Sequence, residues 1–341
     1  AALGGAGHAL TGVTAVSGGQ AGPTVAIRAD MDALPIQEQN AVPYASTVPN
    51  VMHACGHDGH VATVLGAAMV LSKLAPLPGT VKFIFQPAEE GPGGAQPMIE
   101  AGVLQNPPVE AIFGLHLTNT LPVGQIGVCY GQTCAATDEI RITVLGKGGH
   151  GAHPHQAIDA IVAAAQVVGS LQTVASRQVN PLESVVVTIG TIVGGYANNV
   201  IADRVKLSGT VRTLNETLRA DIPRKIEQII RGVTTAHGAD YRFEYLRGYP
   251  SLVNDSTLTS LLEASAVKAV GRENVVPYPP SMGGEDFAYF AQAIPGAFFR
   301  LGSGSETYTH PGHHPQFDFA EDALGVGVKV LVQAVLDYFR I

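Results

Sequence analysis

Short apolar runs alternate with an amphipathic stretch along the first part of this chain. The runs Val25–Ala29, Thr80–Gln86 and Ala111–Leu115 are rich in apolar and β-branched residues, which is typical of buried strands. Between the first two runs, apolar residues recur on one face from Asp58 to Leu74, so we expect a helix there with Asp58 as its N-terminal cap. Strands that alternate with helices predict an α/β sheet.

The pattern changes after residue 137, where runs of strand and helix character follow in the order β-α-β-β-α-β. These runs are Asp138–Leu145, Gln156–Thr173, Glu183–Val193, Arg204–Arg212, Glu216–His237 and Tyr241–Leu246. This order is the ferredoxin-like signature, and such a unit buries its own core. We therefore expect an inserted α+β domain over residues 135–246, within a larger domain formed by residues 1–134 and 247–341.

The larger domain is expected to resume with three helices and one strand. We place the helices at Ser256–Val270, Glu285–Ala293 and Glu321–Phe339, and the strand at Ala297–Leu301. The acidic pair that opens the second helix, Glu285 with Asp286, has two interpretations. It stabilises the N-terminus of its own helix, or it lines a pocket after the preceding Gly-Gly turn.

Composition and charge limit the partners of this chain. It has 341 residues, of which 46% are hydrophobic, and a formal net charge of -8. There is no basic tract that could neutralise phosphates, so we do not expect nucleic acid as a partner. The longest apolar stretches, such as Val61–Leu71, are too short for a membrane span. Three cysteines, an odd number in a long chain, favour a reducing compartment, the cytoplasm, over a disulfide framework.

Candidate metal ligands are concentrated in residues 53–60, H-A-C-G-H-D-G-H. Cys55 and His57 are separated by one glycine, so a thiolate sulfur and an imidazole nitrogen can converge on one cation. The alternative is a polar loop whose histidines cap the following helix. His53 and His60, which flank the pair, are expected to be either partners of the ligands or simple caps.

More polar residues stand where the predicted strands end. Asp30 follows the first strand, Glu89 and Glu90 follow the second, and His116 follows the third. Because open α/β sheets bind ligands at the carboxyl ends of their strands, we expect an active site at this edge. Metal-assisted hydrolysis needs one carboxylate that binds metal and another that transfers protons, which an adjacent pair can supply. An isolated Glu-Glu pair is more often a solvated turn.

A series of motifs covers nearly the whole chain in a fixed order. They are R-A-D-M-D-A-L-P (28–35), H-A-C-G-H-D-G-H (53–60), F-Q-P-A-E-E-G-P-G-G-A (85–95), G-L-H-L (114–117), G-K-G-G-H-G-A-H-P-H (146–155), G-G-Y-A-N-N-V-I-A-D (194–203), G-T-V-R-T-L-N (209–215), G-G-E-D-F-A-Y-F (283–290) and H-H-P-Q-F-D-F (313–319). With these motifs the chain resembles the amidohydrolase branch of the dinuclear metallopeptidases, which contains aminoacylases, bacterial hippurate hydrolases, thermophilic carboxypeptidases and plant auxin-conjugate hydrolases. The resemblance implies a zinc-peptidase-like catalytic domain and an inserted satellite domain that mediates dimerisation, so a homodimer or a tetramer is expected.

The resemblance also implies the role of each site residue. The implied metal ligands are Cys55, His57, Glu90, His116 and His313. His313 is chosen over His314 because the family's ligand stands two places before a proline, here Pro315. The implied general base is Glu89, and His150 from a neighbouring subunit would polarise the scissile carbonyl. Substrate oxygens would be bound by Asn199 and Arg212, and a ligating imidazole would be oriented by Asp30 and Asp32.

These roles predict a metal-dependent amidohydrolase. It would cleave N-acyl-L-amino acids, such as N-acetyl or benzoyl derivatives, to a carboxylate and a free amino acid by means of a metal-bridging water. Two divalent ions are expected, and Zn, Mn, Co and Ni all suit the ligands. The alternatives are a metallo-carboxypeptidase or dipeptidase acting on short peptides, and a silent binding protein, which the full set of ligands disfavours. Family members begin with a helix patterned L-H-x-x-P-E-L that has no counterpart here, so we expect an upstream segment to be missing.

Overall fold

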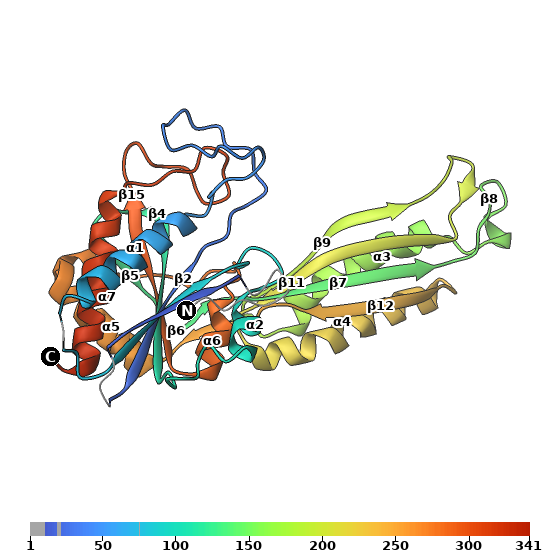
Figure 1. The fold of residues 1–341 in the computed structure, drawn as a ribbon. Coiled ribbons are helices and arrows are strands. Elements are labelled where there is room, and N and C mark those ends of the chain that lie inside the picture. Colours follow the sequence, from blue (N-terminus) through green and yellow to red (C-terminus); the bar gives the residue numbers. More distant parts are fainter. Residues whose placement is uncertain (1–10, 19–21, 75) are drawn as a thin grey trace. The chain divides into compact units, whose positions relative to one another are not determined.

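The chain folds into two compact units. The computed structural model describes residues 11–18, 22–74 and 76–341. The first unit extends to Thr133 and adds Val253–Pro280 and Asp286–Ile341, and the second consists of Cys134–Leu252 and Ser281–Glu285. Both units combine helices with β-sheet (Figure 1), which confirms the predicted α/β class. Among the described residues, no helix has the length and apolar character needed to cross a membrane.

A seven-stranded sheet forms the centre of the first unit. In spatial order its strands are β1 (Val13–Ser17), β3 (Thr80–Gln86), β2 (Thr24–Asp30), β4 (Ala111–Pro122), β15 (Gly296–Gly304), β5 (Ile126–Val128) and β14 (Val275–Pro277). The four strands β3, β2, β4 and β15 run parallel to one another. Every residue of β2 is buried, as expected for a parallel strand that is covered on both faces. The carboxyl ends of these four strands therefore share one edge.

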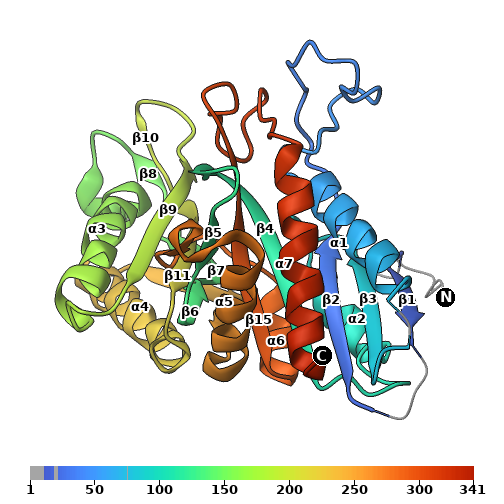
Figure 2. The ribbon, with the colours of Figure 1, turned by 90° about the vertical axis from the view of Figure 1, so that its left-hand side faces the viewer.

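Helices cover this sheet (Figure 2). Two pairs are in contact among the three longer helices, α1 with α7 and α5 with α7, and all three contribute to the main apolar core. Their bounds are α1 (His57–Leu71), α5 (Ser256–Val270) and α7 (Asp322–Phe339). The short helices α2 (Ala95–Glu100) and α6 (Phe287–Ala293) contact each other, and α6 also contacts β4 and β15. These contacts place the start of α6 near the start of α2.

The second unit is an antiparallel four-stranded sheet with two helices. Its strands, in spatial order, are β12 (Asp240–Arg247), β7 (Ala136–Leu145), β11 (Arg204–Thr213) and β9 (Val185–Gly194). The helices α3 (Ala160–Thr173) and α4 (Glu216–Ala236) contact each other and share one apolar core with the sheet. This order of elements confirms the predicted ferredoxin-like arrangement.

Several shorter elements complete the described chain. They are β6 (Gly131–Cys134), β8 (Gly149–His150), β10 (Val200–Ile201), β13 (Leu252–Asn254), the 3-10 turns η2 (Pro154–Gln156) and η4 (Arg272–Asn274), and the π-helical turn η3 (Val174–Gln178).

Two predicted boundaries next to the site were wrong. The strand expected to end before His116 continues through it to Pro122, because β4 stays paired with β15 and His116 lies opposite Arg300. The helix expected to be capped by Asp58 begins two residues earlier than that cap implies, at His57 with Gly56 in the cap position, so Asp58 lies in its first turn.

The start of α3 was also predicted too early. The helix begins at Ala160 rather than Gln156, because Asp159 caps it: its carboxylate accepts hydrogen bonds from the amides of Ile161 and Val162. The preceding residues form only the short turn η2.

A buried ion pair joins the elements of the second unit. Asp138, at the start of β7, is 3% exposed and accepts two hydrogen bonds from Arg219 Nε and one, at 2.6 Å, from Arg219 Nη2. It also accepts hydrogen bonds from Tyr245 OH at 2.8 Å and from the amide of Gly248 at 3.0 Å. One carboxylate thus connects β7 with α4 and β12.

We expect Asp138→Ala to destabilise the second unit by about 3 kcal/mol, because the buried Arg219 guanidinium loses its carboxylate on β7 and retains Glu216 and the carbonyl of Gly248. Urea denaturation followed by circular dichroism would measure this loss. Glu139→Ala is the matched control, since the neighbouring Glu139 forms its ion pair with the exposed Arg141 and its removal should leave the unfolding midpoint nearly unchanged. Equal effects of the two substitutions would contradict the importance of the buried pair.

Candidate active site

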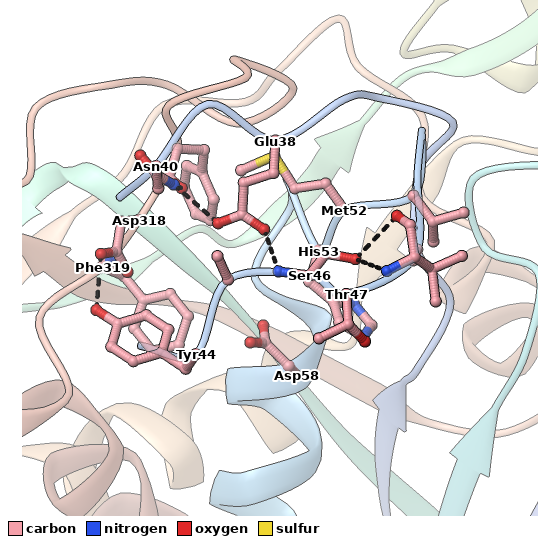
Figure 3. A pocket seen from close by; sticks show the side chains of 15 residues that line it. Glu38, Asn40, Tyr44, Ser46, Thr47, Met52, His53, Asp58, Asp318 and Phe319 are labelled. Carbon is pink, nitrogen blue, oxygen red and sulfur yellow. Dashed lines mark hydrogen bonds between the residues drawn. The ribbon is translucent and has the colours of Figure 1, made fainter. Parts of the chain in front are cut away.

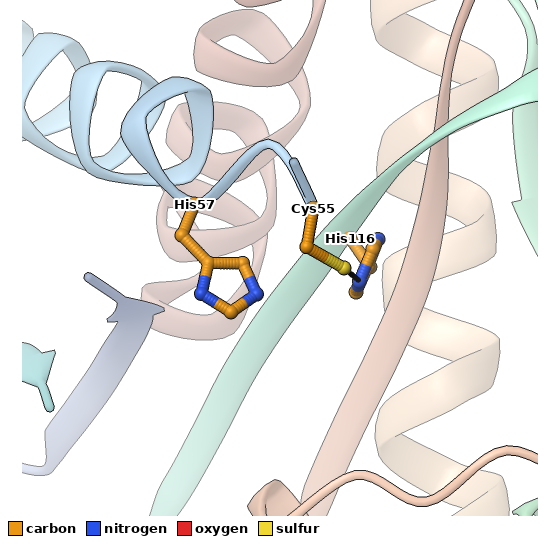
Figure 4. Close-up of side chains that lie close together, drawn as sticks. All are labelled: Cys55, His57 and His116. Carbon is orange, nitrogen blue, oxygen red and sulfur yellow. Dashed lines mark hydrogen bonds between the residues drawn. The ribbon is translucent and has the colours of Figure 1, made fainter. Parts of the chain in front are cut away.

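The predicted ligands Cys55 and His57 lie on the turn that leads into α1. Gly56, between them, has a φ of 82°, a left-handed conformation that glycine adopts without steric cost. The turn directs the thiol and the imidazole to the same side of the loop (Figure 4). His57 is buried and Cys55 is half-buried. Local backbone geometry therefore brings these two predicted ligands together.

His116 completes a first group of ligands. Its Nε2 lies 3.4 Å from Cys55 Sγ (Figure 4), and its Nδ1 donates to the carbonyl of Leu117 at 2.6 Å. In a neutral ring, this donation leaves Nε2 as the unprotonated atom that faces the sulfur. Burial lowers the pKa of His116 well below its ordinary value, and burial together with Glu90 raises the pKa of the Cys55 thiol. A thiolate here therefore needs a neighbouring positive charge, which a metal ion can provide.

Asp32 orients both His57 and the loop that carries the two glutamates. His57 Nδ1 lies 3.2 Å from Asp32 Oδ1, and the amides of Glu89 and Glu90 donate to the same carboxylate at 3.0 and 2.9 Å. Burial lowers the pKa of His57, but the Asp30, Asp32 and Glu90 carboxylates outweigh it and raise that pKa to about 9. The excess of negative charge around this imidazole favours a cation.

Glu90 and His313 form a second group with Cys55. The ligand atoms of these three side chains all lie within 4.8 Å of one another, and Glu90 Oε1 is 2.9 Å from His313 Nε2. His313 has a φ of 68°, which is uncommon outside glycine, and its amide donates at 2.7 Å to the carbonyl just before Cys55. The ring of His314 instead stacks on that of His310, with centroids 4.2 Å apart. His313, and not its neighbour, thus faces the predicted ligands.

Two buried polar atoms in this cluster have no hydrogen-bond partner among the described residues. They are His57 Nε2 and Glu90 Oε1, which lie 3.9 Å apart. Glu90 Oε1 is close to His313 Nε2 but is not aligned for a hydrogen bond with it. Each unpaired buried atom costs about 1–3 kcal/mol, a cost that a shared cation would remove. A donor set of one sulfur, three imidazoles and a carboxylate fits divalent ions such as zinc, so these residues fit a metal centre.

Asp30 and His60 form a buried hydrogen-bonded pair next to the predicted ligands. Asp30 Oδ1 is hydrogen-bonded to His60 Nδ1, and His60 Nε2 accepts from the amide of Leu117 at 2.9 Å. Asp30 approaches the predicted ligand His57 only to 3.7 Å, so its direct imidazole partner is His60. Burial raises the pKa of Asp30, but His57, His60 and Arg28 together hold it well below its ordinary value. Of the two interpretations of His60, the structure supports a partner of the site rather than a cap.

Sequence reasoning missed a second buried network next to Asp30. Arg28 Nη1 donates to Asp30 and Nη2 to Asp286, both at 2.8 Å, and Gln86 donates to both oxygens of Asp286. Of the two interpretations of the acidic pair, a side-chain cap by Asp286 is not seen at α6, and its carboxylate accepts from Arg28 and Gln86 instead. A signal was present: an arginine inside the apolar run Val25–Ala29 requires a buried partner.

The remaining predicted residues lie in the second unit. His150 on β8 is exposed, and the next residue, Gly151, donates its amide to the carbonyl of Asn199 at 2.8 Å. Arg212 lies at the far end of β11. In the pairing of β11 with β7, Arg204 stands opposite Leu145 and Arg212 stands opposite Thr137. Eight residues of strand separate Arg212 from Arg204, or roughly 26 Å. Within one chain, His150 and Asn199 are therefore close together and far from Arg212.

A cavity of about 400 Å³ lies beside the ligand loop in the first unit (Figure 3). His53 and Asp58, which flank the predicted ligands in the sequence, form part of its wall. Across it, Tyr44 OH donates to Asp318 at 2.9 Å and so ties the segment after β2 to the segment that carries His313. The cavity is thus bounded by two of the segments that supply predicted ligands.

Comparison with known proteins identifies the family of this chain. Residues 26–337 match Peptidase family M20/M25/M40. The N-acyl-L-amino acid amidohydrolase of Geobacillus stearothermophilus is 46% identical over 83% of this chain and 77% of its own length, and the N-acetylcysteine deacetylase of Bacillus subtilis is 44% identical over 95% and 84%. A solved Bacillus subtilis structure, described as a dinuclear metal binding peptidase from the M20 family, is 39% identical and superposes with a TM-score of 0.84 over 98% of this chain and 86% of its own. The chain therefore belongs to Peptidase family M20/M25/M40.

Proposed function

We propose that this protein is a metal-dependent amidohydrolase that releases a free amino acid from N-acyl-L-amino acids. The observation that carries the proposal is a pair of buried atoms, His57 Nε2 and Glu90 Oε1, that have no hydrogen-bond partner among the described residues and lie inside a cluster of cysteine, histidine and carboxylate ligands. The relatives named for N-acyl amino acid and N-acetylcysteine hydrolysis support an enzyme that acts on amide bonds. We infer two divalent ions, since a related structure is described as dinuclear.

The metal-holding residues in this proposal are Cys55, His57, Glu90, His116 and His313. Cys55 belongs to two groups of converging ligands, the one with His57 and His116 and the one with Glu90 and His313, so its sulfur could help to hold an ion in either group. Divalent ions held there would supply Lewis acidity, which polarises a carbonyl and makes water more acidic near neutral pH. Asp32 keeps His57 in the tautomer whose Nε2 faces the cluster.

Glu89 is the proposed general base. One of its carboxylate oxygens lies within 4.8 Å of a ring nitrogen of His57 and of a carboxylate oxygen of Glu90, and the residue is 9% exposed. Its carboxylate would accept a proton from the attacking water as the water oxygen bonds to the amide carbon. The same carboxyl would then deliver that proton to the nitrogen as the C–N bond breaks, which leaves a carboxylate and a free amine.

His150, Asn199 and Arg212 are proposed to contact the substrate from two different subunits of a homodimer. His150 Nδ1 accepts a hydrogen bond from the amide of Ala152 at 3.0 Å, so in a neutral ring Nε2 carries a proton that can be donated to a carbonyl oxygen. Because His150 and Asn199 lie far from Arg212 within one chain, a small substrate cannot reach all three unless a second chain contributes. The edge strand β9 exposes Ile192 and Val193, which offers an apolar surface for such a partner.

A carboxypeptidase or dipeptidase activity is the second candidate, because the same ligands and base serve peptide and acyl amide bonds alike. The substrate panel below separates the two.

We expect hydrolysis of N-acetyl, N-benzoyl and indole-acetyl amino acids to stop with a chelator and to return with a restored divalent metal. The panel, assayed by release of free amino acid, should also include dipeptides and peptides with a free carboxyl terminus. Faster cleavage of the peptides would favour the second candidate. Activity that is unaffected by complete metal removal would contradict a metal-dependent mechanism.

Glu89→Gln should lower kcat by about 10²–10⁴-fold while both metals stay bound, because the amide cannot accept the proton. Elemental analysis would measure metal content, and steady-state kinetics would measure turnover. Glu100→Gln, the same change at an exposed residue of α2, is the matched control and should behave as wild type. A fully active Glu89→Gln protein with normal metal content would rule out the assigned base.

His150→Ala should be inactive, and mixing it with Glu89→Gln should restore part of the activity. Mixed dimers would contain one site with an intact Glu89 and a His150 from the other subunit. Subunit exchange would be verified by native mass spectrometry. If exchange occurs and no activity returns, the site is not shared between subunits.

A further inference from the structure

Asp286 occupies the N-terminal cap position of α6, yet its side chain serves another segment. A capping aspartate ordinarily accepts hydrogen bonds from the first amides of its own helix, and Asp286 makes none. Its Oδ2 instead accepts from the amides of Gly94 and Ala95, both at 3.0 Å. Those amides open α2, whose own cap position provides no side-chain hydrogen bond. Asp286 therefore fixes the point where the loop after β3 enters α2.

That loop is the one that carries Glu89 and Glu90. Asp32 accepts from the amides of both glutamates near its start, and Asp286 accepts from the two amides at its end. Between them the loop closes on itself, since the amide of Gly93 donates to the carbonyl of Ala88 at 3.0 Å. A side chain at Gly94 would meet the carbonyl of Pro87 at 1.8 Å, so the chain has little room there. Two carboxylates from distant parts of the sequence hold this loop at both ends.

An ionised carboxylate suits the hydrogen-bond partners of Asp286, while burial, the largest cause, raises the pKa of this group. Its oxygens accept from Arg28 Nη2 at 2.8 Å, from Gln86 Nε2 at 2.8 and 2.7 Å, and from the two amides at the entrance to α2. Every one of these partners is a donor, and both Asp286 and Arg28 are buried. An asparagine would point its own N–H groups at some of these donors and would leave them unpaired.

We propose that Asp286 is a positioning residue that, with Arg28, holds the loop of Glu89 and Glu90 in its working conformation. The proposal rests on the proposed function in one respect, namely that Glu89 is the general base and must be correctly placed for catalysis. Arg28 connects the two ends of the arrangement, because it donates to Asp286 and also to Asp30 beside the ligand histidines. Loss of the Asp286 charge releases the far end of the loop, and Glu89 moves away from the reacting atoms.

Hydrogen exchange tests the positioning without relying on activity. In Asp286→Asn, peptides that cover residues 87–95 should exchange about tenfold faster or more, while peptides of α6 stay unchanged. The matched control is Asp255→Asn, the same change at an aspartate that caps its own helix α5 through the amide of Leu258. It should leave residues 87–95 as in wild type. Exchange that stays at the wild-type rate in residues 87–95, or that rises only in α6, would overturn the proposal.

Kinetics provide the second readout. Asp286→Asn should retain its bound metal and lower kcat by about 10–100-fold, because a displaced base costs turnover. KM should change by no more than about threefold, since substrate-binding groups are untouched. A wild-type kcat per metal-loaded site would show that Asp286 does not position Glu89 for catalysis. If the wild-type protein hydrolyses no amide at all, the proposed function fails, and hydrogen exchange alone decides the positioning role.

Arg28→Lys keeps the test decisive if Asp286→Asn does not fold. Lysine preserves the charge but cannot bind Asp30, Asp286 and Gln86 together as the guanidinium does. Exchange in residues 87–95 should again rise, by a smaller factor. A folded Arg28→Lys protein with a wild-type exchange rate in that loop would contradict the proposal.

Discussion

The guanidinium of Arg28 is the contact on which the arrangement of the site depends. It lies inside β2, where it donates to Gln86 at 2.9 Å and to Asp30 and Asp286 at 2.8 Å. A buried arginine stripped of such partners would cost several kcal/mol, so the sheet is stable only when all of them are in place. Through these hydrogen bonds the end of β2, the end of β3 and the start of α6 are fixed relative to one another.

Hydrogen bonds also orient the imidazole rings of the site. His57 is oriented by Asp32, and the Nδ1 atom of His116 is fixed by the carbonyl of Leu117. His60 connects Asp30 with the amide of Leu117, so it joins the carboxylates of β2 to β4. Each predicted ligand imidazole in this group thus has one nitrogen engaged and the other directed at the cluster. Supporting hydrogen bonds of this kind determine how well ligands converge on a metal.

The second unit is held together by the buried Asp138–Arg219 pair, and the side chains proposed to bind substrate are spread along its sheet. His150 and Asn199 lie beyond one end of β11 and Arg212 lies near the other. This separation fits the proposal that two subunits contribute to each site. The order of the motifs along the sequence does not indicate which subunit would supply each substrate-binding side chain, because that assignment depends on distances in the folded sheet.

The sequence by itself determined the fold class, the ferredoxin-like insertion and the groups that converge at one sheet edge. Apolar periodicity reports burial, and parallel strands align their carboxyl ends, so Glu90, which follows β3, could be placed at that edge from its position in the chain. His116 was placed there too, although it lies within β4 rather than at its end. The sequence did not reveal β1, α2 or the role of Asp286. Short elements such as these have too few residues for a pattern, and a side chain that binds amides 192 and 191 residues away leaves no local signal. Only tertiary structure decided which donors surround each buried carboxylate, because those contacts join strands and helices that are distant in the chain.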